Sequence, residues 1–149
     1  MKENSSIIQY LTAVKTMLTG KQAEYYKWVL EHGKYFDGKS RDKETERKMI
    51  EMCFSHSEME CYYNSQMLVL NGRDFEYYEG WYVPDKLFPI SHGFVVSNGR
   101  VVDVTVNSRH EVLEYFGVNI PNKFVASSIK RRKITEPLIV EYWRSELNG

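Results

Sequence analysis

The stretch that most limits the fold of this chain is PISHGFVVSNGRVVDVTV, residues 89–106. Two alternating runs are joined in it by Asn98-Gly99. Asn-Gly between two such runs is the strongest short signal of a β-hairpin, because both residues tolerate the positive φ of a two-residue turn. The sequence therefore predicts an antiparallel hairpin over residues 90–106.

The register of this hairpin brings a histidine and an aspartate together. A two-residue loop pairs Ser97 with Arg100, which places Phe94 opposite Asp103. Residues two apart on a strand share a face, so His92 and Asp103 become diagonal neighbours on one face of the sheet. A three-residue loop would put them on opposite faces. An ordinary strand pair without chemistry is the alternative interpretation.

The rest of the chain predicts one α+β domain over residues 1–149, with N-terminal helices packed on a small antiparallel β-sheet. Apolar spacing and breakers indicate helices first and strands later. The expected helices cover 5–18, 21–32, 46–54, 57–70 and a short 110–117. A polar loop that runs into a helix start is expected over 37–47, and a strand with a bulge at Gly80 over 74–83. Residues 118–128 are expected to be a loop with at most one strand, and 137–147 a final helix or strand.

Composition excludes several classes of protein. The chain has 20 basic and 20 acidic residues, so its net charge of zero gives no general attraction to nucleic acid. No run approaches the roughly 18 apolar residues of a membrane span, and the first residues lack the pattern of a secretory signal. We therefore expect a cytoplasmic protein without membrane contact, with Cys53 and Cys61 as reduced thiols.

Cys61 is expected near the start of a helix. Ser57 and Glu60 fit the S-x-x-E capping box, and Ser55 and Glu58 offer the same box two residues earlier. Either choice puts Cys61 in the first or second helical turn, where the helix dipole favours a thiolate. A buried, unreactive thiol is the alternative, since free cysteines are among the most buried residues.

Cys61, His92 and Asp103 together supply the parts that covalent cysteine catalysis needs. These parts are a nucleophile, a base, and a group that orients the base. The order is Cys at a helix start, then His on one strand, then Asp on the next. We therefore predict these three residues as the catalytic set.

The layout of ECYYNSQMLVL, YYEGWYVP and PISHGFVVSNGRVVDVT resembles the papain-like and transglutaminase-like superfamily of cysteine enzymes, in particular small bacterial and phage members. The resemblance covers roughly residues 55–107. It implies a papain-like or transglutaminase-like core, with Cys61 as nucleophile, His92 as general base and acid, and Asp103 as orienter. It also implies a thioester intermediate and an amide or ester substrate on a protein, peptide or small amide, cleaved or transferred without cofactor or metal. The activity would be that of a protease, amidase, deamidase or transglutaminase-type enzyme.

The chain departs from that pattern just before the nucleophile. Papain-like proteases carry a glutamine there that helps bind the oxyanion, and residues 52–58, MCFSHSE, contain none. The Cys61 backbone N–H is one donor, and the second is open. We expect Asn64, Tyr78 and Trp81 near the substrate, although a core position suits the aromatic residues equally well. Candidate second donors are Asn64, Gln66, Tyr77, Tyr78 and Trp81. Because the second oxyanion donor is not identified, a non-catalytic protein-interaction module on the same scaffold is the alternative.

Two other functions receive less support from the sequence. A zinc site would need Cys53, His56, Cys61 and His92, but C-x2-H-x4-C is not a common ligand spacing. Nucleic-acid binding would draw on IKRRKI, residues 129–134, without a recognised motif around it. We expect that basic run to be a solvated loop or strand edge that could also contact an acidic partner.

Overall fold

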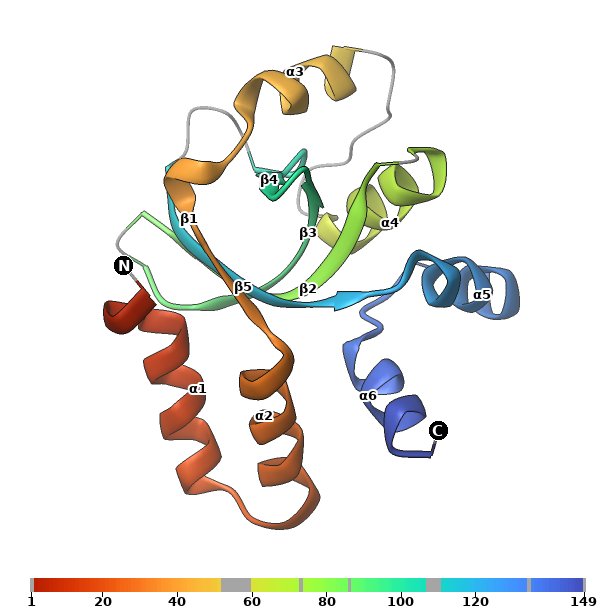
Figure 1. Cartoon of the computed structure of the whole chain (residues 1–149). Helices are drawn as coiled ribbons and strands as arrows, with labels where there is room; N and C mark the ends of the chain where they lie inside the picture. Colours follow the sequence, from red (N-terminus) through yellow and green to blue (C-terminus); the bar gives the residue numbers. More distant parts are fainter. Residues whose placement is uncertain are drawn as a thin grey trace.

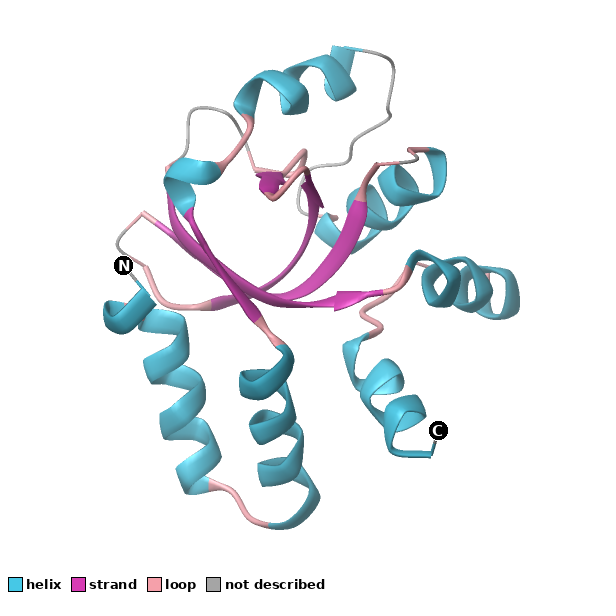
Figure 2. Ribbon diagram, viewed as in Figure 1, coloured by secondary structure: helices cyan, strands magenta, loops and turns pink. Residues whose placement is uncertain are grey.

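The computed structural model describes residues 2–51, 60–72, 74–85, 87–106, 111–133 and 135–148. Its centre is one antiparallel sheet with strand order β1-β5-β2-β3-β4, which curls so that one face is concave (Figures 1 and 2). The strands are β1 (Lys34–Asp37), β2 (Glu76–Pro84), β3 (Ile90–Ser97), β4 (Arg100–Val102) and β5 (Val112–Ile120). The helices are α1 (Ser6–Met17), α2 (Gly20–His32), α3 (Lys43–Glu51), α4 (Cys61–Asn71), α5 (Asn122–Arg132) and α6 (Ile139–Asn148), with 3-10 turns η1 (Lys2–Asn4) and η2 (Gly38–Ser40). The chain is therefore α+β.

The hairpin register is confirmed. Ser97 pairs with Arg100 and Val95 with Val102, and the turn residues Asn98 and Gly99 have φ values of 53° and 77°. The first two predicted helices form as α1 and α2, and Ser5 caps α1 by accepting a hydrogen bond from the Ile8 N–H at 3.1 Å. The turn residues account for the hairpin and the Ser5 cap for the start of α1, whereas α2 begins without a side-chain cap.

The predictions of a helix over 110–117 and of a loop over most of 118–128 are wrong. Val112–Ile120 form β5, which lies between β1 and β2, and Asn122–Arg132 form α5. The one strand that the prediction allowed within 118–128 is present as the end of β5. Most of β5 is buried on both faces, and such strands lack the alternation that identifies a strand. Its partner β1, at Lys34–Asp37, was not predicted. The polar stretch 37–47 runs into a helix start as expected, because α3 begins at Lys43.

The basic run 129–134 is also placed differently from the prediction. Lys130, Arg131 and Arg132 form the last turn of α5 rather than a loop or strand edge, where cations suit the helix dipole. Arg131 and Arg132 both pair with Glu141 of α6, the latter at 2.8 Å. These arginines therefore join α5 to α6.

Gly80 marks a close approach of strands, not the expected bulge. The irregularity in β2 lies between Val83 and Pro84. A Cβ at Gly80 would meet the Phe116 carbonyl oxygen at 2.0 Å, so any side chain there would push β5 away.

The sheet separates two cores. On the concave face, below α3 in Figure 1, the core is formed by β-strand residues with no contribution from α1, α2 or α6. Its buried members are Tyr78, Phe94, Val96, Val101, Val112 and Tyr115. On the convex face, α1 and α2 cover Trp81, Val83, Phe116 and Val118, while α4, α5 and the start of α6 cover Tyr77, Val95, Val102 and Ile120.

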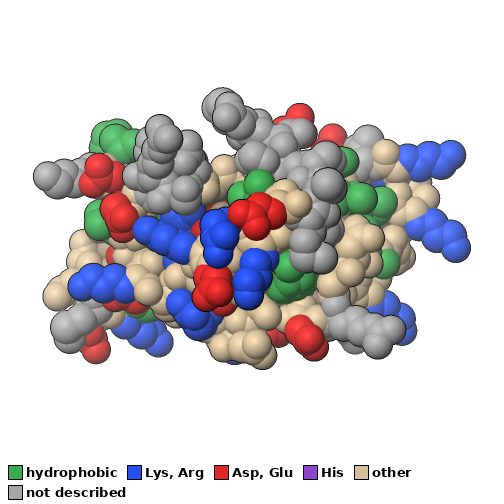
Figure 3. All heavy atoms as spheres, turned by 90° about the horizontal axis from the view of Figure 1, so that it is seen from above, with side chains coloured by type: hydrophobic (Ala, Val, Ile, Leu, Met, Phe, Trp, Pro, Cys, Tyr) green, Lys and Arg blue, Asp and Glu red, His purple; other side chains and the backbone are tan. Residues whose placement is uncertain are grey.

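Seen from above, the face that carries α3 shows basic and acidic side chains interspersed (Figure 3). They form exposed ion pairs such as Lys48–Glu44 at 3.4 Å and Lys43–Glu111 at 3.2 Å. Among the described residues, no helix combines the length and the apolar content that crossing a membrane requires.

Candidate active site

The start of α4 packs against a part of the edge of β3 that β4 does not pair with. In the described residues, β4 pairs with β3 only over Val95–Ser97, so the edge of β3 before Val95 meets α4 instead. The Ser65 hydroxyl donates to the Gly93 carbonyl at 3.1 Å, and the Gly93 N–H donates to Cys61 Sγ at 3.4 Å. A Cβ at Gly93 would lie 2.9 Å from the Tyr62 ring, so the close approach needs glycine. Cys61 thereby reaches the backbone beside His92.

His92 and Asp103 form a buried pair. His92 Nε2 lies 2.7 Å from Asp103 Oδ2, and the two residues are 3% and 1% exposed. The Cys61 thiol lies close enough to the imidazole to help raise the pKa of His92. Because Asp103 engages Nε2, Nδ1 is the ring nitrogen that remains for sulfur. The three predicted catalytic residues are therefore brought into one chain of contacts.

Both carboxylate oxygens of Asp103 accept hydrogen bonds. Oδ2 also accepts the Tyr115 hydroxyl at 2.9 Å, while Oδ1 accepts the N–H groups of Thr105 at 3.2 Å and Val106 at 3.4 Å. Four donors fix the carboxylate plane, and the carboxylate in turn fixes the imidazole orientation. Burial with satisfied hydrogen bonds is the condition under which a charge is stable inside a protein.

A second buried ion pair supports the first. Arg41 Nε donates to Glu46 Oε1 at 2.7 Å, and the same oxygen accepts the Asp103 N–H at 2.8 Å. Arg41 also donates to the Val106 carbonyl at 3.1 Å. The Arg41 charge helps lower the pKa of Asp103, although it ranks after His92 and Tyr115 among the stabilising contributions. Arg41 and Glu46 therefore stabilise both the loop after β4 and its charged aspartate.

The electrostatics give His92 and Asp103 opposite charges at neutral pH. Burial alone would lower the pKa of His92, but the charge and hydrogen bond of Asp103 and the contact with Cys61 raise it from 6.5 to about 9. Burial would raise the pKa of Asp103, but the His92 charge and the donors around the carboxyl lower it below 3.8. The pair is thus an imidazolium beside a carboxylate, and the positive charge lies next to the sulfur.

Tyr82 covers the imidazole. Its ring stacks on His92 with centroids 4.0 Å apart and an interplanar angle of 25°, and it is itself half-buried. Stacking shields one face of the His92–Asp103 hydrogen bond from water and so strengthens it. The sequence analysis did not identify four residues that support the pair, namely Tyr82, Tyr115, Arg41 and Glu46. Their residue types alone do not show that they lie near His92. Their position depends on the order of strands in the sheet, and β1 and β5 were not recognised as strands.

Cys61 is the first residue of α4, so its predicted place near a helix start is correct, but the residue that caps the helix differs from the prediction. Glu60 is the N-cap residue rather than the third helical residue, and its side chain makes no capping hydrogen bond. The first helical bond is the Asn64 N–H to the Glu60 carbonyl at 2.9 Å. Ser55, Ser57 and Glu58 lie outside the described residues. Within the described residues, the N–H groups of the first turn therefore receive no hydrogen bond from the side chain of the N-cap residue.

The remaining predicted site residues are not at the sulfur. Asn64 is buried and donates from Nδ2 to Thr105 Oγ1 at 3.0 Å, which ties α4 to the loop after β4. Tyr78 is 2% exposed and stacks on Phe94 in the concave core, and Trp81 is 8% exposed in the convex core. Their burial argues against the predicted contact of Tyr78 and Trp81 with substrate.

The other candidate oxyanion donors are also occupied. Gln66 Nε2 donates to the Tyr77 hydroxyl at 3.0 Å and to the Glu136 carbonyl at 2.7 Å. The Tyr77 hydroxyl donates to Glu79 at 2.7 Å. These groups form a separate buried network on the convex side of β2, so neither Gln66 nor Tyr77 has a free donor for a substrate.

The described residues give no support to the alternative of a zinc site. Cys53 and His56, two of its four ligands, lie outside the described residues, and the part of the chain that is described contains no cluster of three metal-binding side chains.

Comparisons of the chain with protein-family models, with curated proteins and with solved structures find no match. The function has to be argued from the site itself.

Proposed function

We propose that the protein is a cysteine-dependent acyl-transfer enzyme that acts on an amide or ester through a thioester on Cys61. The observation that carries the proposal is the continuous contact from Asp103 through His92 to Cys61, with 2.7 Å between Nε2 and Oδ2. A nucleophile, a proton-carrying base and an oriented partner are the minimum for this chemistry. Cys61 is also partly exposed, so a substrate can reach the sulfur.

The raised pKa of His92 favours a resting thiolate–imidazolium pair in this proposal. The Cys61 thiolate attacks the carbonyl carbon, and a carbon–sulfur bond forms as the carbonyl electrons move to oxygen. When the oxyanion collapses, the bond to the leaving nitrogen or oxygen breaks and His92 gives its proton to that atom. Water or an amine then attacks the thioester, returns a proton to His92 and releases Cys61.

The oxyanion would be held by backbone groups in this mechanism. The N–H groups of Cys61 and Tyr62 belong to the first turn of α4, which the Glu60 side chain does not cap. Donors at a helix start carry the positive end of the dipole and need no reorganisation. This arrangement replaces the missing glutamine with main-chain donors.

The test compares Cys61 reactivity in matched variants, all with Cys53→Ser. Alkylation by iodoacetamide is followed by mass spectrometry from pH 5 to 10, and p-nitrophenyl acetate serves as the acyl donor. We expect Cys61 to be alkylated and acetylated, and we expect His92→Ala to slow both reactions by at least about tenfold. His32→Ala, an exposed histidine that stacks on Trp28, is the control and should change nothing.

The same series gives a pH limit. Because the pKa of His92 is about 9, the acyl-transfer rate should decline as pH rises through that value, where the imidazolium loses its proton. If Cys61 reacts as an ordinary thiol and His92→Ala leaves both rates unchanged, the enzyme proposal is wrong. The non-catalytic interaction module would then be the better account of the same scaffold.

A further inference from the structure

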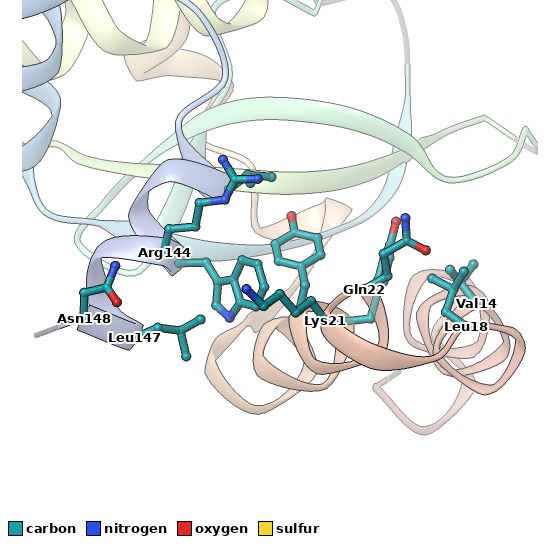
Figure 4. Close-up of a pocket in the computed structure, with 11 residues that line it drawn as sticks. Val14, Leu18, Lys21, Gln22, Arg144, Leu147 and Asn148 are labelled. Atoms are coloured by element: carbon teal, nitrogen blue, oxygen red, sulfur yellow. The ribbon is translucent and has the colours of Figure 1, made fainter.

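A groove lies on the side of the molecule away from β4, between α1, α2 and α6. It encloses about 870 Å³ and is lined by eleven residues, all of them described. Val14 and Leu18 lie on one side of it and Leu147 on the other (Figure 4). Trp143 of α6 adds to its apolar surface. Leu147 is 60% exposed, so the groove presents apolar surface that the protein does not itself cover.

The charges in this groove have one sign. Lys21 and Arg144 are its two charged lining residues, and none of the eleven is acidic. Lys21 extends from α2 toward α6, and Arg144 projects from α6 (Figure 4). Within the described chain neither has an ion pair, whereas Arg131 and Arg132 nearby in the fold both pair with Glu141. Two unpaired cations beside apolar surface favour a ligand with an anionic group and an apolar body.

The size of the groove decides between two kinds of occupant. Small-molecule sites enclose about 300–1,000 Å³, and 870 Å³ lies in that range. A docked helix about 10 Å across that rises 1.5 Å per residue would fit only roughly seven residues, about two turns, into the same volume. That is shorter than the helices that globular proteins ordinarily use. The volume therefore suits a small amphiphile better than a helical partner.

We propose that this groove is a binding site for a single-chain anionic amphiphile, with its anionic group between Lys21 and Arg144 and its apolar chain along Val14, Leu18, Trp143 and Leu147. The site is separate from Cys61 and independent of any activity there. Both cationic side chains are exposed, so replacing them leaves the folded core intact.

The experiment uses the full chain and sodium dodecanoate below its micellar concentration. Binding is followed by NMR at the Trp143 indole N–H and the Leu147 methyl groups, and by calorimetry. We expect one saturable site and at least a tenfold weaker affinity in the double variant Lys21→Gln, Arg144→Gln. Lys27→Gln removes an exposed α2 cation outside the groove and should leave the affinity unchanged.

Dodecyltrimethylammonium and dodecanol separate the contributions of charge and chain. The proposal expects both to bind at least tenfold more weakly than dodecanoate. Equal binding of the cationic amphiphile, an unchanged affinity in the double variant, or shifts confined to other surfaces would overturn it. A twelve-residue acidic amphipathic helix that binds the groove more tightly than dodecanoate would also overturn it, in favour of a protein partner.

Discussion

Two carboxylates that are buried on opposite sides of one sheet have opposite electrostatics. Asp103 follows β4 on the concave side, and Glu79 lies in β2 on the convex side; both are 1% exposed. Burial raises the pKa of Glu79 from 4.5 to about 7, against the opposing effect of its hydrogen bonds, whereas the pKa of Asp103 is lowered despite burial. Equal burial therefore does not determine the charge state.

The partners explain the difference. Among the described residues, Glu79 accepts from neutral donors alone, namely the Tyr77 hydroxyl at 2.7 Å and the N–H groups of Leu138 at 2.6 Å and Ile139 at 3.0 Å. It thus caps the start of α6 from the sheet. Asp103 has the His92 imidazolium in contact and the Arg41 charge nearby. A formal counter-charge offsets desolvation, while neutral donors offset only part of it.

The largest effect should come from removing each carboxylate charge. Asp103→Asn leaves the buried His92 imidazolium without its counter-charge, whereas Arg41 keeps its ion pair with Glu46. We expect the variant to lower the free energy of unfolding at pH 7 by about 3–5 kcal/mol. Glu79→Gln removes a carboxyl that is about half protonated at that pH and should cost about 1–2 kcal/mol.

Urea unfolding at pH 7 measures both losses. Alkylation of Cys61 adds a second readout, because only Asp103→Asn should slow it. Equal losses of stability in the two variants would show that the counter-charge does not distinguish the sites.

The pH dependence of stability should separate the two sites next. A raised pKa in a folded acid stabilises the protonated form, so the Glu79 contribution is greatest below pH 4.5 and declines by about 3 kcal/mol as pH rises to 7. The raised pKa of His92 stabilises its protonated form, so that contribution is complete below pH 6.5 and is lost as pH rises through about 9.

These two windows are measured as differences between the wild-type unfolding curve and those of Glu79→Gln and His92→Gln. Glu24→Gln, an exposed α2 change, is the control for general charge effects. The assignment of separate pH ranges to Glu79 and His92 would be contradicted if both variants lost stability relative to wild type over the same pH range. It would also be contradicted if the stability difference between wild type and Glu79→Gln grew as pH rises.

The smallest effects should come from a matched pair of hydroxyl deletions. Tyr115→Phe removes the donor to Asp103, and Tyr77→Phe removes the donor to Glu79. Each should cost about 1–2 kcal/mol of unfolding free energy, since one buried hydrogen bond is lost. Only Tyr115→Phe should move the acid limit of Cys61 alkylation to higher pH, because that hydroxyl helps lower the pKa of Asp103. An identical alkylation profile in both variants would argue that Tyr115 acts only on stability.

The prediction of the site succeeded where the interactions are local. The Asn98-Gly99 turn determined the register, and the register placed His92 and Asp103 on one face. The prediction failed where partners come from distant strands. Tyr115 was assigned to a helix because β5 is buried on both faces, and Tyr78 and Trp81 could not be assigned to a core or a cleft from alternation alone.

Asn98, Gly99 and the alternating residues around them by themselves determined the hairpin, since turn geometry and a two-residue period need no distant partner. Helix spacing likewise determined α1 and α2. Only the tertiary structure decided that β5 is central and that Arg41, Tyr82 and Tyr115 converge on His92 and Asp103. It also decided that the described donors to Glu79 are all neutral. The reason is physical: strand order and the electrostatics of a buried group depend on contacts between residues far apart in the chain, and a local pattern contains no information on which of those contacts form.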